Sequence, residues 1–250
     1  MGQRIAIISA LHPELAEVLA LMPDEHKRSL GGRTFWSGHL HGHDVVATLS
    51  GMGKVAAATT TSLLIDHFKA EQIIFTGVAG GLAVGTEVGD VVVGNGFVQH
   101  DMDASPMFPR FELPGQGITR LPADGVLTQV LQEAAEDAVT WLPKLLDAAT
   151  LASLGLHRPA VHKGLIVSGD RFVSTAAESH ALREALPDAL AVEMEGAAVA
   201  QVCHDYAIPF AAVRTISDRA DAQAHLDFSD FVNQVASPYA LAVVSQFIRL

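Results

Sequence analysis

Two glutamates, Glu193 and Glu195, stand where an apolar run that predicts a buried strand meets a row of small residues that predicts a helix start. Ligands of open α/β sheets bind at the carboxyl ends of the strands, where an unpaired buried charge is costly. Paired ligand hydroxyls, such as those of a ribose, would give these carboxylates hydrogen-bond partners. The alternative is structural, because acids are favourable at helix N-termini and both glutamates could cap the following helix. The motif alone leaves both interpretations open.

Other chemically capable residues also follow predicted strands. Glu14 lies in the first helical turn after the first predicted strand, Phe172 follows a central one, and Asp218 follows the last one. The glycine-rich segment 77–81 follows another. Because ligands gather at the carboxyl ends of strands in α/β proteins, we expect these residues to lie together with Glu195. Glu14 alone could be explained by the helix dipole, so the coincidence of position is the stronger evidence.

Two glycine-rich turns approach known phosphate-binding motifs without matching them. The segment 50–55 lacks the first glycine of a P-loop at the required spacing, and Val55 stands where that motif has Ser or Thr. The segment 77–81 lacks the spacing of the dinucleotide fingerprint. Both turns still predict close approach of a ligand to the backbone, and the first adds N–H groups at a helix N-terminus.

Two groups of potential metal ligands occur in a predicted hairpin and a predicted loop, namely His39, His41 and His43, and His100, Asp101 and Asp103. Strand alternation would place the three histidines of the hairpin on one face. However, Gly42 bends that run, and no carboxylate or cysteine completes the set. A hydrogen-bonded loop explains the second group more simply. We therefore predict neither a metal site nor a cofactor.

Composition narrows the class of protein. Hydrophobic residues make up 49% and charged residues 18% of the 250 residues, which excludes a disordered chain. The net charge of −12 disfavours binding to nucleic acid. No apolar run reaches the roughly 20 residues of a membrane span or forms a signal-peptide core. The single cysteine, Cys203, is interpreted as a small buried hydrophobe. We expect a soluble, cytoplasmic protein.

The predicted elements alternate between strand and helix, which is typical of α/β folds. No linker divides the chain, so residues 1–250 are predicted to form one domain. The expected strands are 4–10, 34–39, 43–49, 72–76, 88–94, 161–168, 189–192 and 210–217. The expected helices begin at His12 and cover 55–68, 124–156 with a break at Pro143, 174–186 with Ser174 as N-cap, the segment after Gly196, and 228–248.

Short motifs in a fixed order cover nearly the whole chain. They are SGMGKVAA at 50–57, TGVAGGL at 76–82, GLIVSGD at 164–170, VEME at 192–195, RTISD at 214–218, AD at 220–221 and HL at 225–226. Together they resemble the bacterial 5′-methylthioadenosine/S-adenosylhomocysteine nucleosidases, within the nucleoside phosphorylase superfamily. The resemblance implies a single α/β domain with a central mixed, twisted and partly barrel-like sheet flanked by helices. It also implies a homodimer and a role in methionine salvage.

The resemblance implies catalytic roles for matching residues. Glu14 matches the acid that activates water, and Asp218 matches the acid that protonates the purine at N7. Glu195 matches the residue that holds the ribose hydroxyls, with Met194 packed against the sugar. Breaking the N-glycosidic bond develops positive charge on the sugar and negative charge on the base, so the two catalytic acids must be held in opposite protonation states. General acid or base help is typically worth ~10²–10⁴-fold each.

It also implies how a nucleoside would be bound. Phe172 matches the aromatic residue that stacks on adenine, and the backbone of Val173 matches the group that contacts its Watson–Crick edge. A loop of the partner subunit, matching roughly Met102–Pro114, closes the pocket in the family. The apolar wall around the ribose and the 5′ substituent is matched by Leu11, Met52 and Phe228.

Some positions depart from the family. Leu11 stands where Met is common, Met52 where Ile is common, and Val78 where Ser is common; these changes could alter 5′ specificity, although swaps of similar size are usually tolerated. The stretch Trp141–His157 is longer than usual, and a packed surface extension is its simplest interpretation. Three alternatives stay open: a futalosine-type nucleosidase, a nucleoside phosphorylase, which would need basic residues for phosphate, and a non-catalytic nucleoside-binding regulator.

Overall fold

Among the described residues, ten strands form one sheet, and five of them close on themselves as a barrel, each pairing with the next in the ring β5–β10–β6–β8–β9. The computed structural model describes residues 3–146, 148–153, 156, 159–221 and 224–249. The barrel strands are β5 (Gln72–Gly81), β6 (Val91–Gln99), β8 (Val161–Ser168), β9 (Ala189–Glu193) and β10 (Phe210–Asp218). The others are β1 (Ile5–Ser9), β2 (His26–Leu30), β3 (Arg33–Leu40), β4 (His43–Leu49) and β7 (Leu121–Pro122).

The sheet extends beyond the barrel from β5, in the order β5–β1–β4–β3–β2. β1 pairs in parallel with both β4 and β5, whereas β2, β3 and β4 form an antiparallel meander. Strand β1 is buried along its whole length, as expected for a parallel strand covered on both faces. Strand β10, which is parallel to β5 and antiparallel to β6, is buried along its whole length as well. The predicted mixed, partly barrel-like α/β sheet is confirmed.

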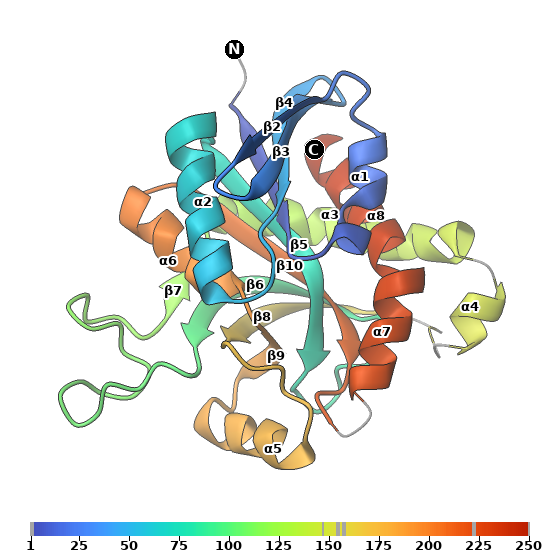
Figure 1. Ribbon diagram of the computed structural model, residues 1–250. Coiled ribbons are helices and arrows are strands. Elements are labelled where there is room, and N and C mark those ends of the chain that lie inside the picture. Colours follow the sequence, from blue (N-terminus) through green and yellow to red (C-terminus); the bar gives the residue numbers. More distant parts are fainter. Residues whose placement is uncertain (1–2, 147, 154–155, 157–158, 222–223, 250) are drawn as a thin grey trace.

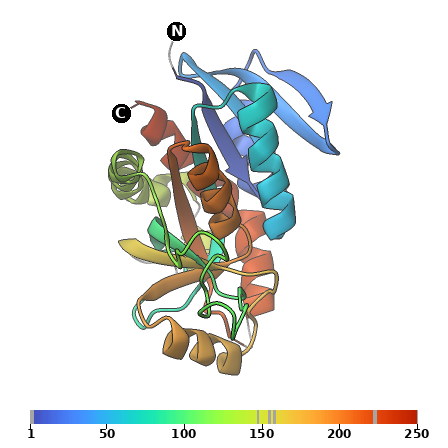
Figure 2. The ribbon, with the colours of Figure 1, turned by 90° about the vertical axis from the view of Figure 1, so that its left-hand side faces the viewer.

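Helices cover both faces of the sheet (Figure 1). They are η1 (His12–Glu14, a 3₁₀ turn), α1 (Ala16–Ala20), α2 (Lys54–Phe68), α3 (Gly125–Leu145), α4 (Ala148–Ser153), α5 (Ala176–Ala185), α6 (Gly196–Tyr206), α7 (Ala224–Gln234) and α8 (Ala236–Arg249). Helices α2 and α6 pack together with residues such as Phe75 and Ile216 in one core cluster. Helices α1, α3 and α8 contribute to a second cluster with Ile7 and Val213. The loop after β6 projects from the body of the barrel in Figure 1 and lies in front of the barrel in Figure 2.

Several predicted boundaries are wrong for physical reasons. The segment 77–81, predicted to be a loop, continues strand β5, because its glycines still pair with β9 and β10. The strand predicted at 88–94 is displaced to β6. Thr175 rather than Ser174 is the N-cap of α5, since its side chain accepts the N–H of Glu178.

The helical predictions also need correction. The closing helix predicted at 228–248 is two helices, α7 and α8, that meet at Val235. Helix α3 runs through Pro143 and ends at Leu145, so the predicted break there is wrong. Strand β2 was not predicted, because its residues are mostly exposed and polar.

The stretch Trp141–His157 comprises the end of α3 and helix α4, and residues 147, 154–155 and 157 of it lie outside the described residues. Leu146 and Leu156 belong to the core cluster of α3 and α8, so part of the stretch packs against the body of the protein. In the described part of the chain, no helix is long and apolar enough to cross a membrane.

Candidate active site

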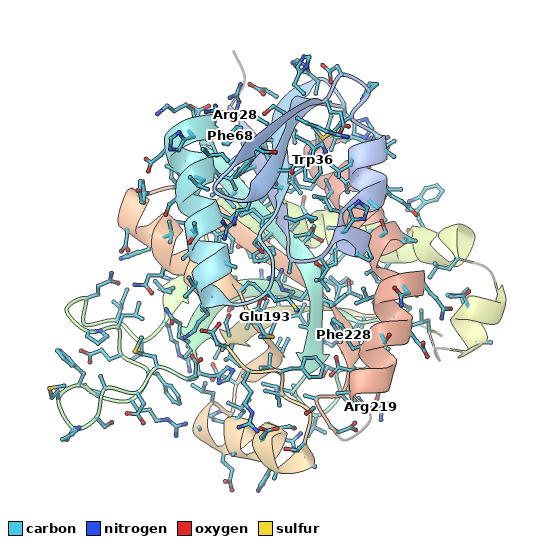
Figure 3. All side chains as sticks on the ribbon, viewed as in Figure 1. Arg28, Trp36, Phe68, Glu193, Arg219 and Phe228 are labelled. Atoms are coloured by element: carbon cyan, nitrogen blue, oxygen red, sulfur yellow. The ribbon has the colours of Figure 1, made fainter. Side chains whose placement is uncertain are left out.

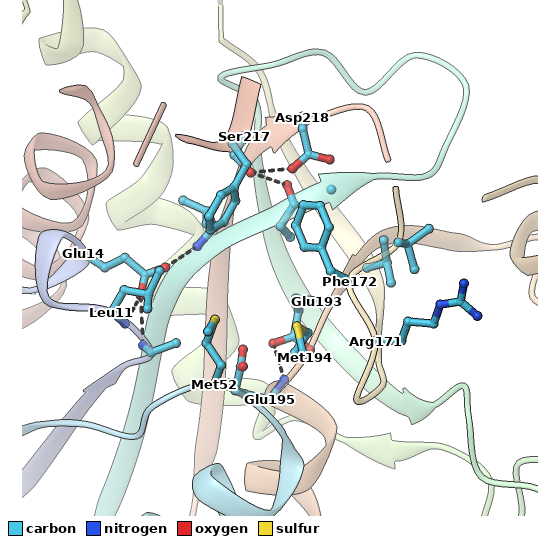
Figure 4. A pocket seen from close by; sticks show the side chains of 17 residues that line it. Leu11, Glu14, Met52, Arg171, Phe172, Glu193, Met194, Glu195, Ser217 and Asp218 are labelled. Atoms are coloured by element: carbon cyan, nitrogen blue, oxygen red, sulfur yellow. Dashed lines mark hydrogen bonds between the residues drawn. The ribbon is translucent and has the colours of Figure 1, made fainter. Parts of the chain in front are cut away.

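One pocket lies at the carboxyl ends of β1, β5, β8, β9 and β10. Its walls combine carboxylates with apolar and aromatic side chains, as in sites that bind small molecules. Every site residue singled out in the sequence lines it: Leu11, Glu14, Met52, Val78, Phe172, Val173, Met194, Glu195, Asp218 and Phe228. Figure 4 shows Glu14 and Asp218 at different sides of this cavity. The fold thus joins segments that are far apart in the sequence.

Glu14 is held by backbone donors. Its Oε2 accepts the N–H groups of Ala10 at 2.9 Å and Leu11 at 2.7 Å, and its Oε1 accepts that of Val78 at 3.1 Å. The side chain is buried, and this burial raises its pKa, although the three N–H groups and the Arg214 guanidinium act in the opposite direction. A carboxylate with a raised pKa and a fixed orientation is suited to accept a proton.

Glu193 and Glu195 have different partners, which separates the two interpretations of this motif. Glu193 accepts the N–H groups of Glu195 at 3.1 Å and Gly196 at 2.8 Å, so it serves as the structural acid at the start of α6. It also accepts the hydroxyl of Ser168. Glu195 makes no such cap and instead accepts the N–H of Gly53 at 2.7 Å.

Burial, together with the nearby Glu193 carboxylate, raises the pKa of Glu195 to about 8. The N–H of Gly53 and the charge of Arg214 work against this rise. Glu195 is therefore the acid of the pair that faces the pocket with acceptor capacity left for a ligand, since it has only one N–H donor in the described network.

Arg214 neutralises the structural acid. Its Nη2 donates to Glu193 Oε2 at 2.8 Å, and its Nη1 donates to the carbonyl of Phe75 at 3.1 Å. The guanidinium also lies 4.0 Å from the centre of the Phe75 ring. Both charged side chains are almost wholly buried. Removing one partner of such a pair typically costs about 3–5 kcal/mol, because the other charge stays buried and uncompensated.

Asp218 ends β10 on the far side of the pocket. The Ser217 hydroxyl lies 2.8 Å from its Oδ2 and donates to it, and the N–H of Ala220 donates to Oδ1 at 2.8 Å. Gly80 gives this carboxyl its space, because a Cβ there would lie only 3.0 Å from Asp218 Oδ1. Both donors stabilise the ionised carboxylate that would remain after Asp218 gave up a proton.

Aromatic and apolar side chains complete the wall. The rings of Phe172 and Phe228 meet edge to face with their centres 5.5 Å apart, and Figure 3 shows Phe228 on α7 facing the pocket region near Glu193. Phe172 is 37% exposed and Met52 is 63% exposed. Buried acids therefore line the inner part of the pocket, and accessible apolar side chains surround its opening.

Sequence reasoning missed some residues of this site. Ser217 and Arg214 lie on the strand that carries Asp218, and Gly77 leaves room for Glu14, since a Cβ there would lie 2.9 Å from Glu14 Oε1. An arginine inside an apolar strand needs a buried acid as partner, so Arg214 was a detectable signal. The partner itself could not be read from the sequence.

The two groups of potential metal ligands noted in the sequence do not form metal-binding clusters among the described residues. Within the described residues, no group of three or more His, Cys, Asp or Glu side chains is arranged to hold a metal ion. His39 pairs with Asp24 at 2.7 Å, and His41 lies in the turn between β3 and β4. Asp101 is bound to Lys54 at 2.6 Å.

The phosphorylase superfamily model matches residues 4–249. The chain belongs to this superfamily. The match includes the barrel, the extended sheet and the pocket, so it rests on the whole fold rather than on one short motif.

Solved structures refine this placement. The chain is similar to the 5′-methylthioadenosine/S-adenosylhomocysteine nucleosidase of Neisseria meningitidis, solved with methylthio-immucillin-A, with 34% identity, 99% of each chain covered and a TM-score of 0.87. The Streptococcus pneumoniae nucleosidase, solved with a transition-state inhibitor, is 30% identical over 98% of each chain, with a TM-score of 0.84. The futalosine hydrolase of Helicobacter pylori is 31% identical, with 99% of this chain and 98% of that chain covered and a TM-score of 0.85. The family resemblance predicted from the motifs is confirmed.

Proposed function

We propose that this protein hydrolyses the N-glycosidic bond of 5′-methylthioadenosine and S-adenosylhomocysteine, releasing adenine and the 5′-thioribose. The observation that carries the proposal is that Glu14, Glu195 and Asp218 line one pocket in different hydrogen-bonding environments. The similarity to nucleosidases of known structure supports the substrate class.

In this mechanism Asp218 donates a proton to the purine at N7 and becomes the carboxylate that Ser217 and Ala220 stabilise. Glu14 takes a proton from water at the opposite side of the sugar, and the water oxygen bonds to the anomeric carbon as the bond to the base breaks. The two acids lie at different sides of the cavity (Figure 4). We expect inversion at the anomeric carbon, as in glycosidases that activate water opposite the leaving group.

Glu195 accepts hydrogen bonds from the ribose hydroxyls, with Met194 against the sugar. Binding of these donors favours the ionised form of Glu195, because hydrogen bonds to a carboxylate stabilise its charge. Phe172 stacks on adenine and the Val173 backbone contacts its edge. Leu11, Met52, Val78 and Phe228 form the apolar surroundings of the ribose and the 5′ substituent.

The deciding experiment is release of adenine from methylthioadenosine without added phosphate. A phosphorylase would depend strictly on phosphate, and such dependence would reject the proposal. Of the described residues that line the pocket, Arg171 is the one with a positive charge, and it pairs with Glu178 at 2.5 Å. This arrangement favours water over phosphate as the nucleophile. A non-catalytic regulator would bind nucleosides without releasing any base.

Futalosine hydrolysis is the second candidate, because the Helicobacter pylori futalosine hydrolase is about as similar as the other nucleosidases. The same catalytic residues would act on a different 5′ substituent. Values of kcat/KM for methylthioadenosine, adenosylhomocysteine, 5′-deoxyadenosine and futalosine, measured side by side, separate the two. We expect the thioether substrates to rank first, since the 5′ surroundings are apolar.

We also propose a homodimer in which the loop around Met102–Pro114 of one copy closes the pocket of the other. This loop projects from the body of the protein in Figure 1, and its Met107 is exposed. Met52 at the pocket mouth and Val55 one turn on are exposed as well, which leaves an apolar surface that a second copy would cover. Val55→Asp should give monomers in light scattering and a raised KM. Methionine salvage and a cytoplasmic location stay predictions of the sequence.

A further inference from the structure

A ring of polar contacts beside the pocket is not used in the mechanism above. Lys54 takes part in it twice. Its backbone N–H donates to Asp170 Oδ1 at 2.7 Å, and its Nζ donates to Asp101 Oδ1 at 2.6 Å. The N–H of Asp170 donates to Asp101 Oδ2 at 2.9 Å and closes the ring.

The ring joins the segment that supports the proposed ribose site to the segment that carries the proposed base site. Gly53, directly before Lys54, donates its N–H to Glu195, the proposed ribose ligand. Asp170 is separated from Phe172, the proposed stacking residue, by one residue. Lys54 is therefore next to the N–H that holds the proposed ribose ligand, and Asp170 is two residues from the proposed stacking residue.

The contacts around the ring leave little freedom. The Lys54 ammonium is largely buried, with 16% of the side chain exposed, and it also donates to Gln99 Oε1 at 3.0 Å. A Cβ on Gly53 would lie 3.0 Å from Asp170 Oδ1. Burial acts to raise the pKa of Asp101, but the Lys54 ammonium and the N–H of Asp170 hold it below its usual value, so Asp101 is ionised.

We propose that Lys54 and Asp101 are positioning residues that fix the distance between the ribose-binding turn and the base-binding loop. This inference rests on the proposed nucleosidase function. Neither side chain lines the pocket. They act through Gly53 and Asp170, and they thereby keep the sugar and the base correctly positioned relative to each other while the glycosidic bond breaks.

The kinetic consequence differs from that of losing a binding group. Phe172 and Glu195 stay present when the ring opens, so ground-state binding tolerates small displacements. The transition state is less tolerant, because a shift of about 1 Å in a positioned group can cost ~10²-fold. Lys54→Met and Asp101→Asn should each lower kcat by about 10- to 100-fold and change KM by less than about threefold.

The test measures kcat and KM for methylthioadenosine in both single variants, in the double variant and in Asp188→Asn. Asp188 pairs with Arg120 at 2.5 Å in an exposed ion pair outside the pocket, so its loss is the matched control and should leave both constants unchanged. If the ring acts as a unit, the fall in kcat is no larger in the double variant than in either single variant. Single variants that behave like the control, or losses that multiply in the double variant, would overturn the inference.

Hydrogen–deuterium exchange supplies a readout that needs no activity. Opening the ring should speed exchange of the amides in both 51–55 and 169–173, while the melting temperature stays close to that of the control variant. Faster exchange in only one segment would show that the ring does not join them. A wild-type protein that releases no adenine would reject the proposed function instead. The exchange data would still test whether the ring joins the two segments.

Discussion

Gly77→Ala tests the placement of Glu14 more sharply than replacing Glu14 itself. The added Cβ would lie 2.9 Å from Glu14 Oε1, so the oxygen must retreat by several tenths of an ångström. The bond from the Val78 N–H to the same oxygen is already 3.1 Å long. We therefore expect this bond to break, with the carboxyl group intact but displaced.

The size of the effect follows from the bond that is lost. A hydrogen bond to a charged group is worth about 1.5–3 kcal/mol, and each 1.36 kcal/mol is tenfold in rate. The variant should lose ~10- to ~150-fold in kcat/KM, as these two values imply together. The Val78 N–H also lowers the pKa of Glu14, so its loss raises that pKa further. Because a base acts in its ionised form, the acidic limb of kcat/KM should move to higher pH.

Gly96→Ala is the matched control, since Gly96 is a buried strand glycine at which a Cβ meets nothing closer than 3.7 Å. Adenine release is followed from pH 5 to 10 in both variants. Gly→Ala at a compatible site is neutral or stabilising by about 0.4–1 kcal/mol, so the control keeps its activity. If Gly77→Ala shows the kcat/KM and pH profile of the control, Glu14 is not the base.

Other substitutions address the remaining groups of the site. Glu195→Gln should raise the melting temperature at pH 9 but not at pH 5. Burial raises the pKa of Glu195 to about 8, so ionisation of this carboxyl lowers the free energy of unfolding. The loss is absent below the unfolded pKa of about 4.5, grows between pH 4.5 and 8, and reaches at most about 5 kcal/mol. Glu17→Gln on the surface should show no such trend. Asp218→Asn should lower kcat by ~10²–10⁴-fold with nucleoside affinity largely kept, and unchanged turnover would remove Asp218 from the acid role. Phe172→Ala should raise the Kd for adenine by ~5- to ~150-fold, since stacking of a base on an aromatic ring is worth about 1–3 kcal/mol, and an unaltered Kd would argue against stacking.

The alternation of apolar runs and amphipathic stretches was sufficient to predict the α/β class and the region of the site. Glu14, Glu195 and Asp218 could be placed together because strand ends of such sheets converge on one edge. Their convergence in one pocket follows from that rule. Their individual roles rest on the family resemblance and stay predictions.

Local patterns failed where tertiary contacts outweighed them. Glycines 77–81 resemble a loop in composition, yet they continue strand β5 because pairing with β9 and β10 satisfies their backbone groups. The exposed strand β2 carries no apolar alternation to detect. The segment 228–248, predicted to be a single helix, contains the end of α7 and the start of α8, which meet at Val235. The apolar periodicity of the segment does not mark this break.

What the sequence by itself determined is therefore the order of elements and which residue types stand at strand ends, since these depend on neighbours in the chain. Only the tertiary structure decided how the acids differ. Glu193 is neutralised by Arg214, 21 residues away, and Glu195 is held by Gly53, 142 residues away. Burial and charged neighbours set the protonation of such groups, and both depend on how distant segments of the chain pack.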